Sequence, residues 1–172
     1  MGYGIGGHTK PNTGYSTEWE TPPKILRALG PFDDDPRLPG KHDGLTRAWQ
    51  GLVWLNPPYT RCGLGAWLEK LSLHPMGGIA LIFARTETRL FVEYVWNRAS
   101  ALLFLYGRPH FYQNGIRAAG NSGGPVVLVG YGEQATTRLR TCGLAGAYVS
   151  GWLSEPLRGL ETHDLEPCHT RI

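Results

Sequence analysis

The residues with the clearest chemical potential are Asn56, Pro57, Pro58 and Tyr59, which follow the apolar run 53–55. Adjacent prolines cannot continue a strand ladder or enter a helix interior, because each lacks an N–H group and has a fixed φ. The segment therefore predicts an open strand end, where a side-chain amide, carbonyl groups and an aromatic ring stand close together. Such a combination suits the binding of a planar exocyclic amine.

The amine of a nucleobase is a poor nucleophile because its lone pair is delocalised into the ring. Two acceptors aimed at its N–H groups favour the tetrahedral geometry in which that lone pair can attack, which is electrostatic preorganisation. We expect Asn56 Oδ1 and the Pro57 carbonyl to be these acceptors, with Tyr59 as a stacking face for a base that has left its duplex. A strand-terminating turn without catalytic role is the alternative interpretation.

Acidic residues upstream could bind a methyl donor, which presents an ammonium group and ribose hydroxyls. Asp33, Asp35 and Asp43 are the candidates. Asp35 is favoured because an Asp-Pro pair at a strand end would direct the carboxylate into a cleft, whereas strand alternation predicts that Asp34 faces outward. Solvated turn aspartates are the alternative interpretation.

The elements that must position these residues can be predicted from apolar patterns and breakers. Thr21, Pro22 and Pro23 favour the start of a helix over 24–29. We expect buried strands at 52–55, 79–83, 101–105 and 125–129, helices at 64–71 and 87–98, and a hairpin turn at Asn114-Gly115. This alternation predicts an α/β domain with a mostly parallel sheet ending in an antiparallel hairpin. Ligands bind at the carboxyl ends of such strands, where Asp35 and Asn56 would both lie.

Length and composition favour one intracellular domain. The 172 residues suffice for a single core, which we expect at 18–150, between an N-terminal arm at 1–17 and a C-terminal tail at 151–172. The sequence contains no apolar run of about 18 residues, so no membrane span is expected. The N-terminus lacks an apolar signal region. Three scattered cysteines favour a reducing cytoplasm. Cys168 with His163 and His169 lacks zinc-type spacing, so no metal is expected.

Positive charge is concentrated in one stretch of the chain. Residues 85–140 contain seven arginines and three glutamates. Arginine is suited to bidentate contacts with phosphates and bases, so this stretch favours a nucleic-acid face. Arg85 and Arg89 follow a predicted strand, where Arg85 could contact DNA phosphate or a donor carboxylate, and Arg108 and His110 belong to the predicted hairpin. Solvated arginines and a packing hairpin are the alternatives.

Several motifs in order carry a resemblance to a known family over roughly residues 6–131. They are Gly-Gly-His8, Glu18-Trp-Glu-Thr21-Pro22-Pro23, Phe32-Asp33-x-Asp35-Pro36, Asp43-Gly44-Leu45, Val-Trp-Leu-Asn56-Pro57-Pro58-Tyr59, Ala84-Arg85-Thr86-Glu87-Thr88, Gly107-Arg108-Pro-His-Phe111 and Asn121-Ser122-Gly-Gly-Pro125. With these motifs the chain resembles the phage-type DNA N6-adenine methyltransferases, a family of small Dam-like enzymes encoded by phages and prophages.

The resemblance implies a Rossmann-like fold, S-adenosyl-L-methionine as the methyl donor and adenine N6 in DNA as the acceptor. It implies that Asn56, Pro57, Pro58 and Tyr59 form the pocket for the flipped base. It also implies that the Thr21-Pro22 segment approaches the donor, with Asp33, Asp35, Asp43 and His8 as further donor contacts, and that the protein works in the cytoplasm of a host cell.

Two further hypotheses remain open from the sequence. The same tetrapeptide could serve methylation of an RNA base or a protein amide. A non-catalytic DNA-binding relative is conceivable as well, because the chain has no Phe-x-Gly-x-Gly loop of the kind that usually binds the methionine part of the donor.

Overall fold

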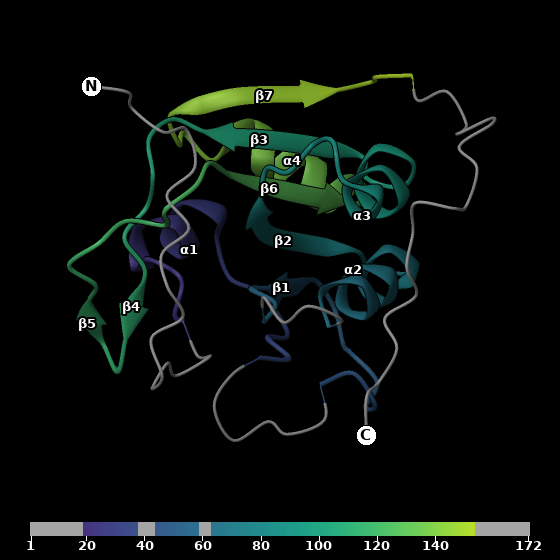
Figure 1. Cartoon of the computed structure of the whole chain (residues 1–172). Coiled ribbons are helices and arrows are strands. Elements are labelled where there is room, and N and C mark those ends of the chain that lie inside the picture. The colour runs from purple at the N-terminus through teal and green to yellow at the C-terminus, as the bar shows by residue number, and fades with distance from the viewer. Residues whose placement is uncertain (1–18, 38–43, 59–62, 154–172) are drawn as a thin grey trace, which may run out of the picture.

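The computed structural model describes residues 19–37, 44–58 and 63–153, so most of the predicted arm and tail lies outside the described residues. The elements, shown in Figure 1, are α1 Pro23–Leu29, β1 Val53–Leu55, α2 Leu64–Leu73, β2 Gly78–Phe83, α3 Arg89–Phe91, a π-helical turn η1 Val92–Trp96, β3 Ala101–Leu105, β4 Tyr112–Gln113, β5 Ile116–Arg117, β6 Val126–Tyr131, α4 Glu133–Thr141 and β7 Gly146–Ser150. None of the helices in the described ranges is both long and apolar enough to span a bilayer.

The main sheet is mixed, with five strands in the order β1-β2-β6-β3-β7. Among the described residues, β1 and β2 pair in parallel, whereas β6 is antiparallel to both β2 and β3, and β7 is antiparallel to β3. The prediction of an α/β domain is confirmed, but that of a mostly parallel sheet is wrong. The reason is β6, which enters between β2 and β3 after the hairpin and runs opposite to both.

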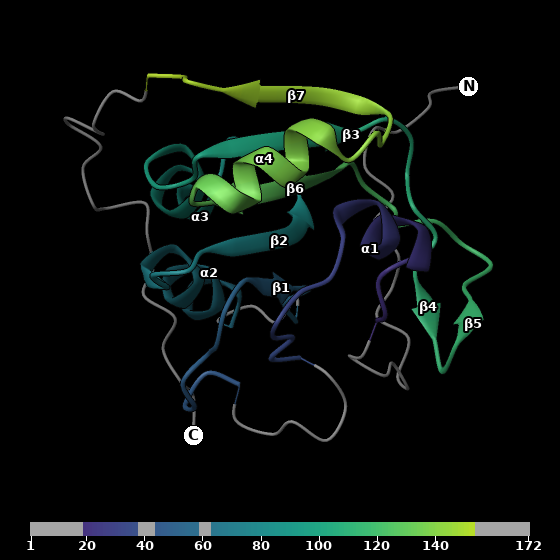
Figure 2. The same ribbon diagram turned by 180° about the vertical axis from the view of Figure 1, so that it is seen from behind.

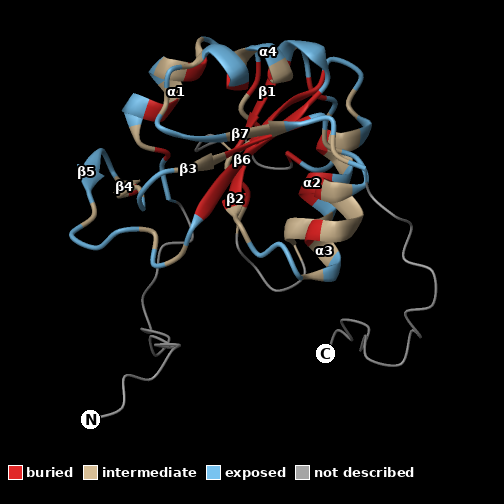
Figure 3. Ribbon diagram, turned by 90° about the horizontal axis from the view of Figure 1, so that it is seen from above, coloured by how far each residue is buried: buried red, intermediate tan, exposed pale blue. Residues whose placement is uncertain are grey.

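Helices cover both faces of this sheet and give three layers (Figure 3). On one face, α2 and the α3–η1 segment bury Trp67, Leu68, Leu71, Phe91 and Val95 against Val53, Leu55, Ala80 and Ile82. On the other, α1 and α4, which stand in front of the sheet in Figure 2, bury Ile25, Leu29, Ala135 and Leu139 against Trp54, Ile79 and Leu81. Alternate residues of each strand thus enter different cores, as the two-residue period of a strand requires.

Three strands end at the same edge of the sheet. β2 and β3 run in the same direction because both are antiparallel to β6, and β1 is parallel to β2. Their carboxyl ends, followed by Asn56, Ala84 and Tyr106, therefore share one edge, which we term the carboxyl edge. It lies on the side of the molecule where α1 and the β4–β5 hairpin are found (Figure 1).

The hairpin turn is confirmed at the predicted residues. Asn114 and Gly115 both have positive φ, at 52° and 73°, which is the conformation of the tight turns that match strand twist. The hairpin forms its own two-stranded sheet and does not extend the main one. Helix α1 also ends where predicted, because Gly30 adopts a φ of 84° and its N–H bonds the Leu26 carbonyl.

Candidate functional site at the carboxyl edge

Asn56 is the first residue after β1, and its amide is held in a defined orientation. Its Nδ2 donates a hydrogen bond to the Trp19 carbonyl at 2.5 Å. Asn56 and Pro58 are half-buried and Pro57 is buried, so the segment is packed into the edge. With Nδ2 engaged, Oδ1 is the atom of this amide that is left to accept a hydrogen bond. Tyr59, the predicted stacking ring, lies outside the described residues.

The segment that holds Asn56 is itself anchored to the hairpin. Glu20 and Tyr112 exchange two backbone hydrogen bonds, of 2.8 and 3.0 Å, in an isolated antiparallel bridge. The Glu20 carboxylate oxygens also accept from the Gly115 N–H at 3.2 and 3.3 Å. Hydrogen bonds therefore link the hairpin, the segment that leads into α1 and the end of β1. Nothing in the sequence pattern indicates this role of Trp19 and Glu20.

Thr21 carries an unsatisfied polar atom at this place. The residue is 7% exposed, and its Oγ1 has no hydrogen-bond partner among the described residues. Buried hydroxyl groups are nearly always hydrogen-bonded, so an orphaned one calls for an explanation such as a bound ligand. Pro22, the next residue, is half-buried and precedes the first turn of α1.

Asp33 supports the entry of the chain into β1. Its Oδ2 accepts the Leu52 N–H at 2.7 Å, and its own N–H bonds the Leu52 carbonyl at 2.9 Å. Gly51 has a φ of 57°, and a Cβ there would lie 2.3 Å from Asp33 Oδ2. Glycine is thus needed for the contact, and the described role of Asp33 is to position β1.

Asp34 is buried, which contradicts the prediction that it faces outward. It is 5% exposed and accepts two hydrogen bonds from Arg47, at 2.6 and 2.7 Å. The hydrogen bond to Asp34 is the main reason why the pKa of the Arg47 guanidinium is raised. Strand alternation failed here because the segment makes a single parallel bridge, between Asp34 and Val53, and is not a regular strand.

Asp35 directly follows Asp34, which bridges to β1. It is half-buried, and its Oδ1 accepts the Arg37 backbone N–H at 3.1 Å. The parallel bridge between Asp34 and Val53 aligns this segment with β1, so Asp35 leads toward the edge where Asn56 stands. The other two predicted donor contacts, Asp43 and His8, lie outside the described residues.

The predicted nucleic-acid residues differ in their surroundings. Arg85 lies just beyond the end of β2 and Arg108 beyond the end of β3, so both come after strands that end at the carboxyl edge. Both residues are exposed. His110 is half-buried, and its Nδ1 donates to the Ala118 carbonyl at 3.1 Å, which closes the base of the hairpin. Arg89 is exposed on α3, and its Nε lies 3.6 Å from a carboxylate oxygen of Glu93, in an exposed ion pair.

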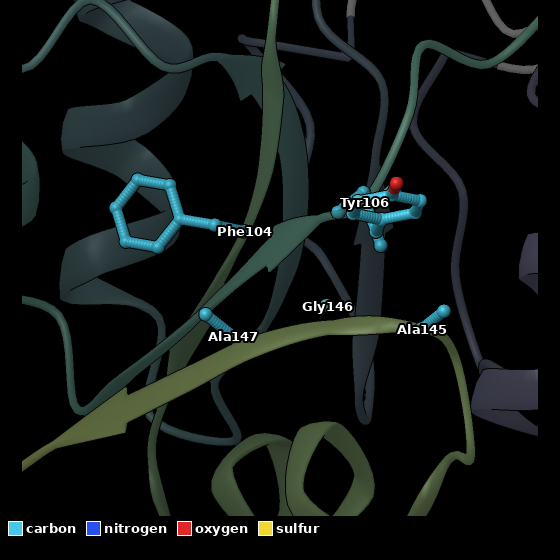
Figure 4. A pocket seen from close by; sticks show the side chains of 6 residues that line it. Phe104, Tyr106, Ala145, Gly146 and Ala147 are labelled. Atoms are coloured by element: carbon cyan, nitrogen blue, oxygen red, sulfur yellow. The ribbon is translucent and has the colours of Figure 1, made fainter.

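Two surface hollows border the sheet. The larger, of about 440 Å³, lies between β3 and β7 and is lined by Phe104, Leu105, Tyr106, Ala145, Gly146 and Ala147 (Figure 4). Among the described residues that line it there is no carboxylate, amide side chain or basic group, and the Tyr106 hydroxyl is its titratable group. The second, of about 250 Å³, lies at the carboxyl edge between the end of β2 and the start of β6.

Comparison with known proteins adds no relative. No protein-family model, no curated protein and no solved structure matches the chain.

Proposed function

We propose that the chain is an S-adenosyl-L-methionine-dependent methyltransferase that modifies the N6 amine of adenine in DNA. The observation that carries this proposal is the fixed amide of Asn56 at the carboxyl edge, followed by two prolines and bonded through Nδ2 to the Trp19 carbonyl. This arrangement favours an acceptor oxygen, and not a donor N–H, as the group that faces a substrate amine.

The proposed chemistry uses two acceptors on one amine. Asn56 Oδ1 accepts one N–H of the adenine amine and the Pro57 carbonyl accepts the other, which favours the tetrahedral nitrogen whose lone pair attacks a methyl carbon. The nitrogen–carbon bond forms as the carbon–sulfur bond of the donor breaks, the electron pair of that bond stays on the sulfur of the neutral thioether that leaves, and the nitrogen then loses one proton to solvent. Because the Trp19–Asn56 hydrogen bond is already formed, the amide needs no reorientation when the amine arrives.

The donor site in this proposal is built around Thr21 and Asp35. S-adenosyl-L-methionine supplies a methyl group on a positively charged sulfur, together with an ammonium group and ribose hydroxyls. The buried Thr21 Oγ1, which has no hydrogen-bond partner among the described residues, and the half-buried Asp35 carboxylate fit such polar groups. Pro22 belongs to the same segment as Thr21. Asp33 would act indirectly, because its Oδ2 holds the Leu52 N–H.

The three-layer arrangement supports a Rossmann-like methyltransferase as the fold, since ligands of such sheets bind at carboxyl ends of strands. DNA as the acceptor is supported by the surplus of arginine over glutamate in residues 85–140. Arg85 and Arg108 are exposed beyond two of the strands that end at the carboxyl edge. The proposed place of action is the cytoplasm of a host cell.

The test is methyl transfer from S-adenosyl-L-methionine with a deuterated methyl group, offered in parallel to duplex DNA, single-stranded DNA, RNA and a protein mixture. Digestion and mass spectrometry should find labelled N6-methyladenine from DNA. Label only in RNA or in a glutamine amide would replace the proposal by one of its rivals, and no label in any acceptor would favour a non-catalytic DNA-binding protein.

Asn56→Ala provides the residue-level test. It should lower methyl transfer by at least about a hundredfold, the size of effect seen when one preorganised polar group is removed from a reacting centre, while DNA affinity changes little. Gln134→Ala, which removes an exposed amide from α4, is the matched control and should retain full activity. Equal activity of the two variants would refute the role of Asn56.

A further inference from the structure

The hollow between β2 and β6 has the composition of a nucleotide-binding surface. Its wall comprises Phe83 at the end of β2, Ala84 and Arg85 just beyond it, and residues 122–125 before β6, around a volume of about 250 Å³. The wall thus combines an aromatic ring, a guanidinium group and a glycine-rich backbone.

The loop that closes the hollow is firmly hydrogen-bonded. The Ser122 N–H bonds the Pro109 carbonyl at 2.8 Å, and the Ala84 N–H bonds the Pro125 carbonyl at 3.0 Å. Ser122 Oγ donates to the Gly124 carbonyl at 2.6 Å, and Asn121 Oδ1 accepts the Gly123 N–H at 3.0 Å. The shape is therefore formed before any ligand arrives, which lowers the entropy lost on binding.

Gly124 places no side chain of its own beside Phe83. A Cβ at residue 124 would lie 3.3 and 3.5 Å from two carbons of the Phe83 ring, tight contact that would fill space on this side of the ring. Gly124 is not among the glycines with positive φ, so backbone conformation does not require glycine here. The absence of a side chain has a steric consequence, namely an apolar wall of Phe83, Gly124 and Pro125.

Arg85 adds a positive charge next to this wall. Its guanidinium carbon lies 5.9 Å from the centre of the Phe83 ring, and the residue is exposed. A nucleotide fits both features, because its base offers a flat surface for the wall and its phosphate a negative charge for the guanidinium. We propose that this hollow binds one nucleotide of a nucleic-acid strand, with the base against Phe83 and Gly124 and its phosphate on Arg85.

Strand register relates this subsite to Asn56. Trp54 pairs with Ile79. Two residues farther along each strand, Asn56 therefore comes level with Leu81. Phe83 lies another two residues along β2. Asn56 and Phe83 consequently share one sheet face at the carboxyl edge, about 8 Å apart by ideal strand spacing. We assign the subsite to the nucleotide adjacent to the target base, an assignment that rests on the proposed function.

The experiment measures binding without any methyl donor. Fluorescein-labelled single-stranded oligodeoxynucleotide is titrated with the full chain by anisotropy at several salt concentrations. Gly124→Ala should weaken binding about fivefold or more, because base–aromatic stacking contributes that much per base. Gly120→Ala is the matched control, since a Cβ there meets no atom within 4 Å, and it should bind as the wild type does.

Arg85→Gln tests the phosphate contact independently of packing. It should weaken binding and lower the slope of log affinity against log salt by about 0.7, the value for one phosphate of a single strand. Arg85→Lys should retain most of the slope, and Arg140→Gln, which removes an exposed arginine from α4, should change neither affinity nor slope. Circular dichroism confirms that each variant is folded, and Arg85→Gln decides alone if Gly124→Ala is not.

The subsite is refuted if Arg85→Gln and Gly124→Ala both bind within twofold of the wild type. It is also refuted if saturating S-adenosyl-L-methionine displaces the oligonucleotide, because Arg85 would then serve the donor. Failure of methyl transfer leaves this binding result untouched. Conversely, if the protein is an active methyltransferase and the variants bind DNA normally, the subsite is refuted and the proposed function stands.

Discussion

The contact between Gly51 and Asp33 should make Gly51→Ala one of the most destabilising glycine substitutions in the described residues. The new Cβ would lie 2.3 Å from Asp33 Oδ2 and 2.5 Å from two of its carbons. The carboxylate must then withdraw from the Leu52 N–H, which removes a hydrogen bond to a charged group worth about 1.5–3 kcal/mol. The left-handed φ adds about 1–2 kcal/mol for any residue with a Cβ.

Gly143→Ala separates the two contributions. Gly143 has a φ of 69° and would place its Cβ in open space, so only the backbone contribution of about 1–2 kcal/mol applies. Urea unfolding followed by tryptophan fluorescence should therefore give a loss of about 2.5–5 kcal/mol for Gly51→Ala and the smaller loss for Gly143→Ala. In a background carrying Asp33→Gly, which removes all three contacted atoms, Gly51→Ala should cost no more than Gly143→Ala.

The reasoning fails if Gly51→Ala and Gly143→Ala destabilise the wild-type chain equally. That result would mean that the Asp33 carboxylate makes no net contribution at the entry to β1. It would also remove the physical reason for assigning Asp33 a positioning role instead of direct contact with a methyl donor.

Two other predictions concern buried polar groups. Asp34→Asn should lower the free energy of unfolding by about 2–4 kcal/mol, because it weakens a pair in which Asp34 is 5% and Arg47 31% exposed; Arg89→Gln, which breaks an exposed pair, should change it by less than about 0.5 kcal/mol in the same urea titration. Burial raises the pKa of Tyr131, whose hydroxyl donates to the Tyr94 carbonyl at 2.7 Å. Its contribution to stability should be complete below the unfolded pKa of about 10 and decline as pH rises above it, so Tyr131→Phe should flatten the alkaline part of a stability–pH curve; an unchanged slope would contradict this.

Local patterns predicted most elements because burial of an apolar run leaves a direct trace in the sequence. The strand expected at 101–105 is β3 Ala101–Leu105, and the helix expected at 64–71 is the start of α2 Leu64–Leu73. The Asn114-Gly115 turn was predictable for a different reason, since both residues tolerate the positive φ that the tight turn needs.

Helix α4 was not predicted because its sequence carries little helical signal. Among its nine residues, Ala135 and Leu139 are the buried ones. These two residues lie one helical turn apart, so the sequence does not show the longer apolar stripe that predicts an amphipathic helix. Three threonines further weaken its intrinsic preference for a helix. Packing against β3 and β6 must therefore stabilise this helix, and such tertiary contacts are invisible to periodicity.

The candidate site was predictable where one segment suffices and unpredictable where segments meet. Asn56 could be placed at a strand end from its own neighbours. The Trp19–Asn56 hydrogen bond joins residues 37 positions apart, and the burial of Asp34 depends on Arg47, so neither has a local signature. Strand direction was missed for the same reason, because a buried apolar run has the same pattern in either orientation.

The position of β6 has a consequence for how the chain is assembled during synthesis. β6 pairs with both β2 and β3, yet it is made after them, so a nascent chain that ends before residue 126 has two apolar strands with open inner edges. Such edges favour association with other chains. Residues 122–125 directly precede β6 and line the hollow at the carboxyl edge, so the sheet centre and this hollow should form in one late step. A chaperone that binds the nascent chain, or slow translation, would therefore affect the formation of the sheet centre and of this hollow together.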